Sequence, residues 1–232
     1  MLHSLGLPLL GAAAGVSTLA LAWHNRQAGR ARLAARHGYF EACLPLFDSP
    51  VKSIAPHGFA RISGRYHGRP FDLQALPDTL SYRKLPALWL LVTLPAPMPV
   101  AATLDVMQRP GGGEVFSHFA TLPVQLPAAP GLPGSAVLRT DDPARLPPES
   151  ILHSHAGLFD SSAVKELLIS PRGLRIVILA EEADRGRYLL FRDAEMGMSA
   201  LSRATLVPFL DRLVAIAGDL ENLSATRTEK TA

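Results

Sequence analysis

Two histidines separated by one residue are the feature of this sequence that most suggests chemistry. His153 and His155 flank Ser154, and Asp160 follows five residues after the second imidazole. If the backbone is extended, side chains at positions i and i+2 lie on one face, where two imidazoles can share a metal ion. If the segment is helical, the two rings point about 200° apart and cannot share one.

The residues around the histidine pair favour the helix. Pro147 and Pro148 suit the first turn of a helix, and Ile151 and Leu158 have helical spacing. The pattern therefore predicts a short helix over 149–159. In that case the two histidines are ordinary, partly exposed side chains.

No other motif indicates a reaction. A Gly-x-Ser-x-Gly nucleophile turn is absent, and the glycine triplet at 111–113 is followed by Glu114, an acid that would repel phosphate. The only cysteine, Cys43, excludes an internal disulfide and is expected to be a small buried side chain. We therefore expect no cofactor and no catalysis, with a metal-dependent hydrolase centred on His153 and His155 as the minority alternative.

The uncharged, mostly apolar stretch 5–23 organises the rest of the chain. About 20 apolar helical residues cover the hydrocarbon thickness of a bilayer, and a helix satisfies every backbone polar group in lipid. The stretch therefore predicts a single transmembrane helix. A cleaved signal peptide is the alternative, because Ala20-Leu21-Ala22 is a small-x-small site; the lack of a basic residue before the stretch disfavours it.

One face of this helix carries small residues. Gly11 and Gly15 are four residues apart, and Thr18 and Ala22 extend the pattern on nearby faces. Small side chains at this spacing allow a second helix to approach closely in lipid. We expect these residues to pack against another membrane protein or a second copy of the chain.

Basic residues on one side of the stretch predict its orientation. Arg26, Arg30, Arg32 and Arg36 follow Trp23, and the first 40 residues contain no acid. Arginines collect on the cytoplasmic side of membrane helices, and tryptophan is common at the interface. The sequence therefore predicts a bacterial inner-membrane protein with its N-terminus outside, and these five side chains are expected to contact anionic lipid headgroups.

The charge of the remaining chain argues against nucleic-acid binding. The formal net charge is +3, but residues 1–40 carry four arginines, so residues 41–232 carry 19 basic and 20 acidic side chains. A near-neutral domain lacks the basic surface that a nucleic acid requires. Arginine (19) far outnumbers lysine (4), which fits a GC-rich bacterial genome.

Hydrophobic periodicity predicts antiparallel strands and two helices, which define an α+β domain. A hairpin is expected to turn at His67 and Gly68. The stretch that carries Trp89 is apolar on both faces, which suits a central strand. The predicted strands cover 59–66, 70–74, 85–94, 102–107, 114–120, 135–140, 163–170, 174–180 and 187–191. The last three of these are expected to form a meander.

The last predicted element is an amphipathic helix over 205–223. Leu206, Leu210, Leu213 and Leu220 fall on one stripe, which is expected to face the sheet. The chain is thus divided into an anchor (1–24), a basic juxtamembrane helix and connector (25–50), a soluble domain (51–223) and a loose tail (224–232).

These features favour a non-catalytic, membrane-anchored accessory subunit. Its transmembrane helix and cytoplasmic domain would both pack on a larger inner-membrane complex. One alternative is a membrane-anchored domain that senses a small molecule or lipid in a pocket between sheet and helix. The other is the hydrolase described above.

Overall fold

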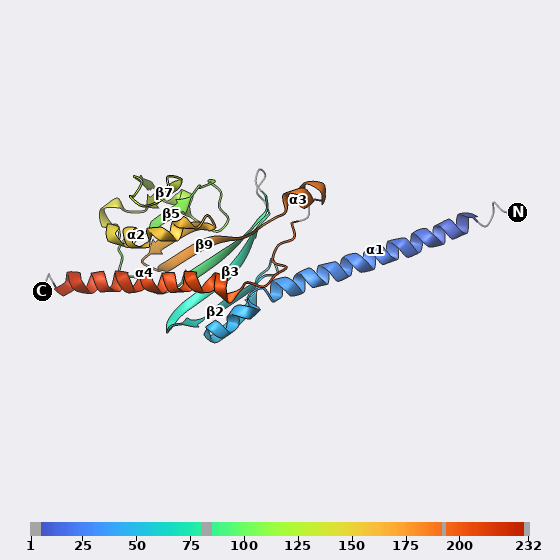
Figure 1. Cartoon of the computed structure of the whole chain (residues 1–232), viewed down its shortest axis with the longest axis horizontal. Coiled ribbons are helices and arrows are strands. Elements are labelled where there is room, and N and C mark those ends of the chain that lie inside the picture. The colour runs from blue at the N-terminus through green and yellow to red at the C-terminus, as the bar shows by residue number, and fades with distance from the viewer. Residues whose placement is uncertain (1–5, 80–84, 192–193, 230–232) are drawn as a thin grey trace.

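The computed structural model describes the backbone of residues 6–79, 85–191 and 194–229, and the side chains of 15–79, 85–190 and 194–226. Within this part of the chain, strands form one antiparallel sheet with helices on it, and a long helix extends from one end (Figure 1). The predicted α+β class is confirmed. The strands are β1 (Asp48–Ile54), β2 (Ala60–Tyr66), β3 (Arg69–Asp78), β4 (Ala87–Leu94), β5 (Leu104–Gln108), β6 (Val124–Leu126), β7 (Ala136–Thr140), β8 (Val164–Ser170) and β9 (Gly173–Glu182).

The helices of the described chain differ greatly in length. Two are long, and the others are short segments that join strands. The α-helices are α1 (Gly6–His37), α2 (Glu149–His155), α3 (Arg185–Phe191) and α4 (Arg203–Glu229). The 3-10 helices are η1 (Glu41–Leu46), η2 (Phe119–Thr121), η3 (Pro143–Arg145) and η4 (Ala156–Asp160).

The strand order is β1-β2-β3-β4-β9-β8-β5-β7-β6, with β4 and β9 in the middle. The predicted β2–β3 hairpin is confirmed: His67 and Gly68 both have positive φ, as a two-residue hairpin turn requires. The predicted central strand is β4, whose two neighbours in the sheet are β3 and β9. Because alternate residues point to opposite faces, every strand contributes to two different surfaces.

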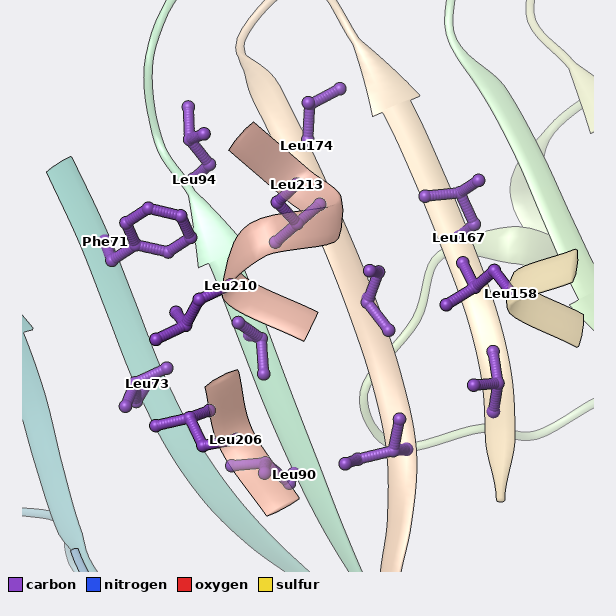
Figure 2. Close-up of a cluster of buried hydrophobic side chains, with 14 of the residues drawn as sticks. Phe71, Leu73, Leu90, Leu94, Leu158, Leu167, Leu174, Leu206, Leu210 and Leu213 are labelled. Carbon is purple, nitrogen blue, oxygen red and sulfur yellow. The ribbon is translucent and has the colours of Figure 1, made fainter. Parts of the chain in front are cut away.

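One face of the sheet forms the core against α4. Leu206, Leu210 and Leu213 are fully buried, and Figure 2 shows them above buried side chains of the central strands. Tight packing of this kind joins the helix to the sheet along its length. The predicted stripe on the C-terminal helix is confirmed. The sheet residues drawn beneath it include Phe71, Leu73, Leu90, Leu94, Leu167 and Leu174.

The opposite face has a smaller apolar cluster and a polar remainder. Leu91, Met107 and Val177 are buried there beneath Phe116 and Phe119 of the β5–β6 connection. This connection covers only part of the face. The polar residues described in the next section lie on the same face, some of them beneath the connection and others beyond it.

The long helix α1 joins the domain through its last residues. Gly38 donates its backbone N–H to Ala34 O at 2.9 Å and follows the last residue of the helix, His37. Tyr39 and Phe40 follow and are buried, and the backbone N–H of Leu201 bonds to Tyr39 O at 2.7 Å. The segment after α1 is therefore fixed to the chain that leads into α4.

The predicted membrane stretch is helical from Gly6 onward. The side chains of residues 1–14 lie outside the described part of the chain. Among the described residues, no helix reaches the combined length and apolarity that crossing a bilayer needs. The division of the chain into anchor, connector, domain and tail stays a prediction.

Two strand predictions are wrong, and strands β1 and β6 were not predicted. Residues 187–191 belong to helix α3, because β9 already has β4 and β8 as partners and no strand position remains beside it. Residues 114–120 are a turn leading into η2, and the short strand β6 follows them. The first three residues of β1 were expected to belong to the connector, and the pattern predicts no strand there because all seven residues of β1 are exposed and show no alternation.

Leu210→Ala is expected to lower the free energy of unfolding by about 2–5 kcal/mol, because it leaves a cavity between α4 and the sheet. Urea unfolding of the full chain in mild detergent measures this. The matched control is Leu189→Ala on α3, a side chain that is 58% exposed and should cost no more than about 0.5 kcal/mol. Equal losses in the two variants would contradict the central place of α4.

Candidate functional site

The predicted helix-packing residues lie on an uncovered part of α1. Gly15, Thr18 and Ala22 are exposed, and a Cβ added at Gly15 would meet nothing within 4 Å. Thr18 donates its hydroxyl to Gly15 O at 2.9 Å, so it satisfies its polar group within the helix. Gly11 lies outside the described side chains. The packing role of these four residues stays a prediction.

Large apolar side chains on the same part of α1 are exposed as well. Val16 is 68% exposed, Leu19 72%, Leu21 61% and Trp23 65%. At 100° per residue these positions lie on more than one side of the helix. The domain therefore leaves this apolar surface uncovered.

The four predicted headgroup arginines separate into two pairs. Arg26 and Arg30 are exposed. Arg32 forms an ion pair with Glu195 at 3.0 Å, and Arg36 lies 5.1 Å over the ring of Phe59. The second pair thus holds α1 on the domain. Headgroup contact stays a prediction that the structure favours most for the first pair.

The two candidate histidines point apart because α2 is a helix. His153 is exposed, whereas His155 is buried, with Nε2 at 2.9 Å from Asp219 Oδ2 on α4. Arg212 Nη1 lies 3.3 Å from Nδ1 of the same ring. Since a guanidinium only donates, Nδ1 accepts and the Nε2–H donates to Asp219. His155 therefore joins α2 to α4, and no group of three metal-ligating side chains occurs among the described residues.

A polar row crosses the face of the sheet opposite α4. Cross-strand pairing places one residue from each of six neighbouring strands side by side on this face. The row runs through Ser63 on β2, Asp72 on β3, Thr93 on β4, Arg175 on β9, Leu168 on β8 and Asp105 on β5. Five of these six side chains are polar, on a face that elsewhere carries the small apolar cluster.

The row forms the floor of a groove made of two adjoining cavities of about 580 and 590 Å³. Thr93, Pro95 and Arg175 line both cavities, so they mark the middle of the groove. Asp105 lies in one cavity and Asp72 in the other. The groove is on the face opposite α4, so it is not the pocket between sheet and helix that the sensing alternative expected.

Most charges on the groove floor are paired. Asp72 accepts hydrogen bonds from Arg61 Nε at 2.7 Å, Ser63 Oγ at 3.0 Å and Gln74 Nε2 at 2.7 Å. Three donors satisfy both oxygens of this nearly buried carboxylate. This end of the groove is therefore an internally satisfied network.

The other end holds two buried carboxyl groups side by side. Glu166 on β8 is fully buried; it accepts from Arg175 Nε at 3.0 Å and from the hydroxyl of Ser117. Asp105 on β5 is only 2% exposed and interacts with Glu166, but its Oδ1 has no hydrogen-bond partner. A buried polar atom without a partner is costly and uncommon in proteins.

Burial and the repulsion between two negative charges favour a proton on this pair. Burial, and then the negative charge of Glu166, raises the pKa of Asp105 to about 9. Burial also raises the pKa of Glu166, whereas Arg175 and Ser117 oppose this effect by stabilising its anion. Glu166 is thus the better stabilised anion and Asp105 the neutral acid. The groove therefore offers a protonated carboxyl group beside an arginine–carboxylate pair.

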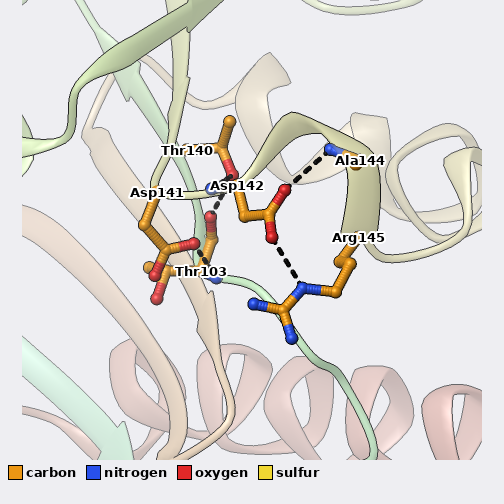
Figure 3. A network of polar contacts seen from close by, with 6 residues as sticks. All are labelled: Thr103, Thr140, Asp141, Asp142, Ala144 and Arg145. Atoms are coloured by element: carbon orange, nitrogen blue, oxygen red, sulfur yellow. Dashed lines mark hydrogen bonds and ion pairs between the residues drawn. The ribbon is translucent and has the colours of Figure 1, made fainter.

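A second polar network closes the groove beyond β5 (Figure 3). Asp141, which lines the groove, accepts the backbone N–H of Thr103 at 2.8 Å. Asp142 caps η3 by accepting from Ala144 N at 2.9 Å, and it pairs with Arg145 at 2.6 Å. Arg145 lowers the pKa of Asp142 below its usual value. These bonds fix the chain between β7 and α2 at the mouth of the groove.

The sequence analysis missed the groove. Its residues come from strands that are far apart in the chain, and each polar residue alternates with apolar neighbours as an ordinary exposed position would. One signal was present: Glu166 lies in the apolar run of β8, where a charged residue needs a buried partner. The sequence could not name that partner.

No known family and no curated protein matches the chain. Among solved structures, it is similar to the crystal structure of the mycobacterial trehalose monomycolate transport factor A, TtfA, at 10% sequence identity and a TM-score of 0.39. The alignment covers 75% of this chain and 99% of that one.

Asp105→Asn is expected to change how stability depends on pH. The folded chain holds a proton on Asp105 from the unfolded pKa of about 3.9 up to about 9, so its stability falls as pH rises through this window. The amide does not titrate, so the stability of the variant relative to the natural chain should rise between pH 5 and pH 9. Thermal unfolding of the full chain across this range measures the difference, which a single extra proton makes grow by about 1.4 kcal/mol per pH unit.

Asp142→Asn is the control for this experiment. The folded pKa of Asp142 is lowered, so this group is ionised in both the folded and unfolded states above pH 5 and adds no slope there. Its profile should run parallel to that of the natural chain. A parallel profile for Asp105→Asn as well would mean that the carboxyl pair holds no extra proton.

Proposed function

We propose that this chain is a membrane-associated accessory protein. The observation that carries the proposal is the uncovered apolar surface of α1, where Val16, Leu19, Leu21 and Trp23 are 61–72% exposed. Apolar surface of this extent marks a site of contact with lipid or with another protein. The domain has its own complete core beneath α4, so α1 is not needed to fill it.

The finer proposal is that residues 5–23 are the membrane anchor. The arginines that follow favour a cytoplasmic domain and an outer N-terminus in a bacterial inner membrane. Arg26 and Arg30 are exposed where headgroups would meet them. Arg32 and Arg36 then hold the domain at a fixed position on the helix.

The accessory role follows from what α1 offers to a neighbour. Open space at Gly15 gives a second helix room to approach. The partner in this proposal is a larger inner-membrane complex or a second copy of the chain. The domain is proposed to dock on the same assembly.

A second candidate is a domain that binds a small polar molecule. The observation that favours it is Asp105 Oδ1, a buried acceptor without a partner in the groove opposite α4. A ligand with a hydrogen-bond donor would satisfy it. This candidate is compatible with membrane attachment through α1.

The natural chain is expected to stay with membranes during alkaline carbonate extraction and to co-purify with an integral membrane complex in mild detergent. Leu19→Glu combined with Leu21→Glu should move it to the soluble fraction, because charges are costly in hydrocarbon. Immunoblotting of the two fractions and mass spectrometry of the co-purified proteins provide the measurement. A natural chain that is released by carbonate, or that purifies alone as a monomer, would overturn the proposal.

Gly11→Ile combined with Gly15→Ile is expected to reduce co-purification without unfolding the domain, because two branched side chains would keep a neighbouring helix away. Ala20→Ile, about 140–180° around the helix from these glycines, is the matched control and should retain the partner. Unchanged co-purification in the double variant would show that the glycine face contacts only lipid.

A further inference from the structure

We propose that α3 is a second membrane contact, which rests on an anionic bilayer surface beside α1. This inference depends on the proposed function, since it assigns a lipid partner to a surface next to the anchor. The sequence pattern predicts a strand over 187–191, where the structure has the helix α3.

The exposed leucines of α3 are not part of the core. Leu190 is 78% exposed and Leu189 58%, whereas Ala183, just before the helix, is 3% exposed. The core clusters of the described chain contain neither leucine. Two adjacent leucines at this exposure leave apolar surface in contact with water. This contact is unfavourable unless lipid or another molecule covers the leucines.

A bridging acid ties α3 to the anchor helix. Glu195 pairs through Oε1 with Arg32 of α1 at 3.0 Å and through Oε2 with Arg187 of α3 at 2.8 Å. Figure 1 shows α3 on the side of the domain from which α1 extends. The ion pairs therefore hold α3 in a fixed position relative to α1. Inserting α1 into a bilayer would bring α3 toward the surface of that bilayer.

The distance along α1 sets what this contact requires. Arg32 follows Trp23 by nine residues, which is about 14 Å of helix and about 10 Å in height at a tilt of about 40°. The headgroup region adds about 5–8 Å outside the hydrocarbon on each side. With Trp23 at the interface, Leu189 and Leu190 reach the headgroups if α3 lies a few ångströms closer to the bilayer than Arg32 does.

The charge of α3 fits an anionic surface. Residues 185–190 include Arg185 and Arg187 and no acid. Three nearby carboxylates are engaged within the protein: Asp184 Oδ1 accepts Arg187 N at 2.7 Å, Glu181 accepts Gly197 N at 2.8 Å, and Glu195 pairs with Arg32 and Arg187. Glu182, at the end of β9, is exposed. Leucines beside arginines on a short helix are typical of interfacial lipid contacts, and this favours lipid over a protein partner.

The test places an environment-sensitive fluorophore on α3. Leu190→Cys is labelled with a nitrobenzoxadiazole group in a full chain in which Cys43→Ser removes the natural, buried thiol. The matched control carries the label at Ala225→Cys, an exposed position on α4 at the opposite end of the molecule from α1 (Figure 1). Both proteins are reconstituted into vesicles of phosphatidylcholine with phosphatidylglycerol, and into phosphatidylcholine alone.

The proposal expects a shift of emission to shorter wavelength at position 190 and a loss of fluorescence when spin-labelled lipid is added, both larger with phosphatidylglycerol. The label at position 225 should show neither change. If the chain floats with the vesicles but the two labels behave alike, the contact by α3 is refuted and the anchor stands. If the chain does not float with the vesicles at all, the proposed function fails and the α3 contact fails with it.

If the label at position 190 is instead shielded only when a co-purified protein is present, α3 contacts that protein and the lipid proposal is overturned. Arg185→Gln provides a second readout, because it removes charge from an exposed position and leaves the fold intact. It should weaken the effect of phosphatidylglycerol on the label at 190. An unchanged effect would argue against attraction to anionic lipid.

Discussion

Burial of the leucine stripe of α4 against one face of the sheet is the interaction on which the rest of the structure depends. Leu206, Leu210 and Leu213 take the apolar residues of the central strands out of water. Because side chains alternate along a strand, the packing of α4 on one face also determines which side chains lie on the opposite face. The polar row that includes Asp72 and Asp105 lies on the face opposite α4 for this reason.

The same packing separates the roles of the two ends of the chain. Since α4 completes the core, α1 contributes only its last turn and the residues that follow it, and residues 15–26 of the helix are exposed. Arg32 and Glu195 then fix how α1 leaves the domain. A helix that leaves a domain in a defined direction determines which surfaces of the domain lie near whatever the helix contacts, whereas a flexible linker would not.

Elements set by local chemistry were predictable from the sequence, and elements set by distant partners were not. The turn at His67 and Gly68 and the stripe of α4 follow from short-range patterns, and both are present. Residues 187–191 combine aromatic and aliphatic side chains that suit either a strand or a helix, and the occupied positions beside β9 decide the outcome. The groove was hidden because Asp105 and Glu166 meet only through strand pairing.

The carboxyl pair in the groove is difficult to explain by stability alone. A neutral Asp105 with an unpartnered oxygen costs free energy, and an apolar residue of similar size at this position would remove that cost. Arg175 and Ser117 are placed to stabilise the charge on Glu166, so the pair is held in a defined arrangement. Groups held at a cost to stability cluster at functional sites. The groove is therefore a candidate binding site that is separate from the exposed apolar surface of α1.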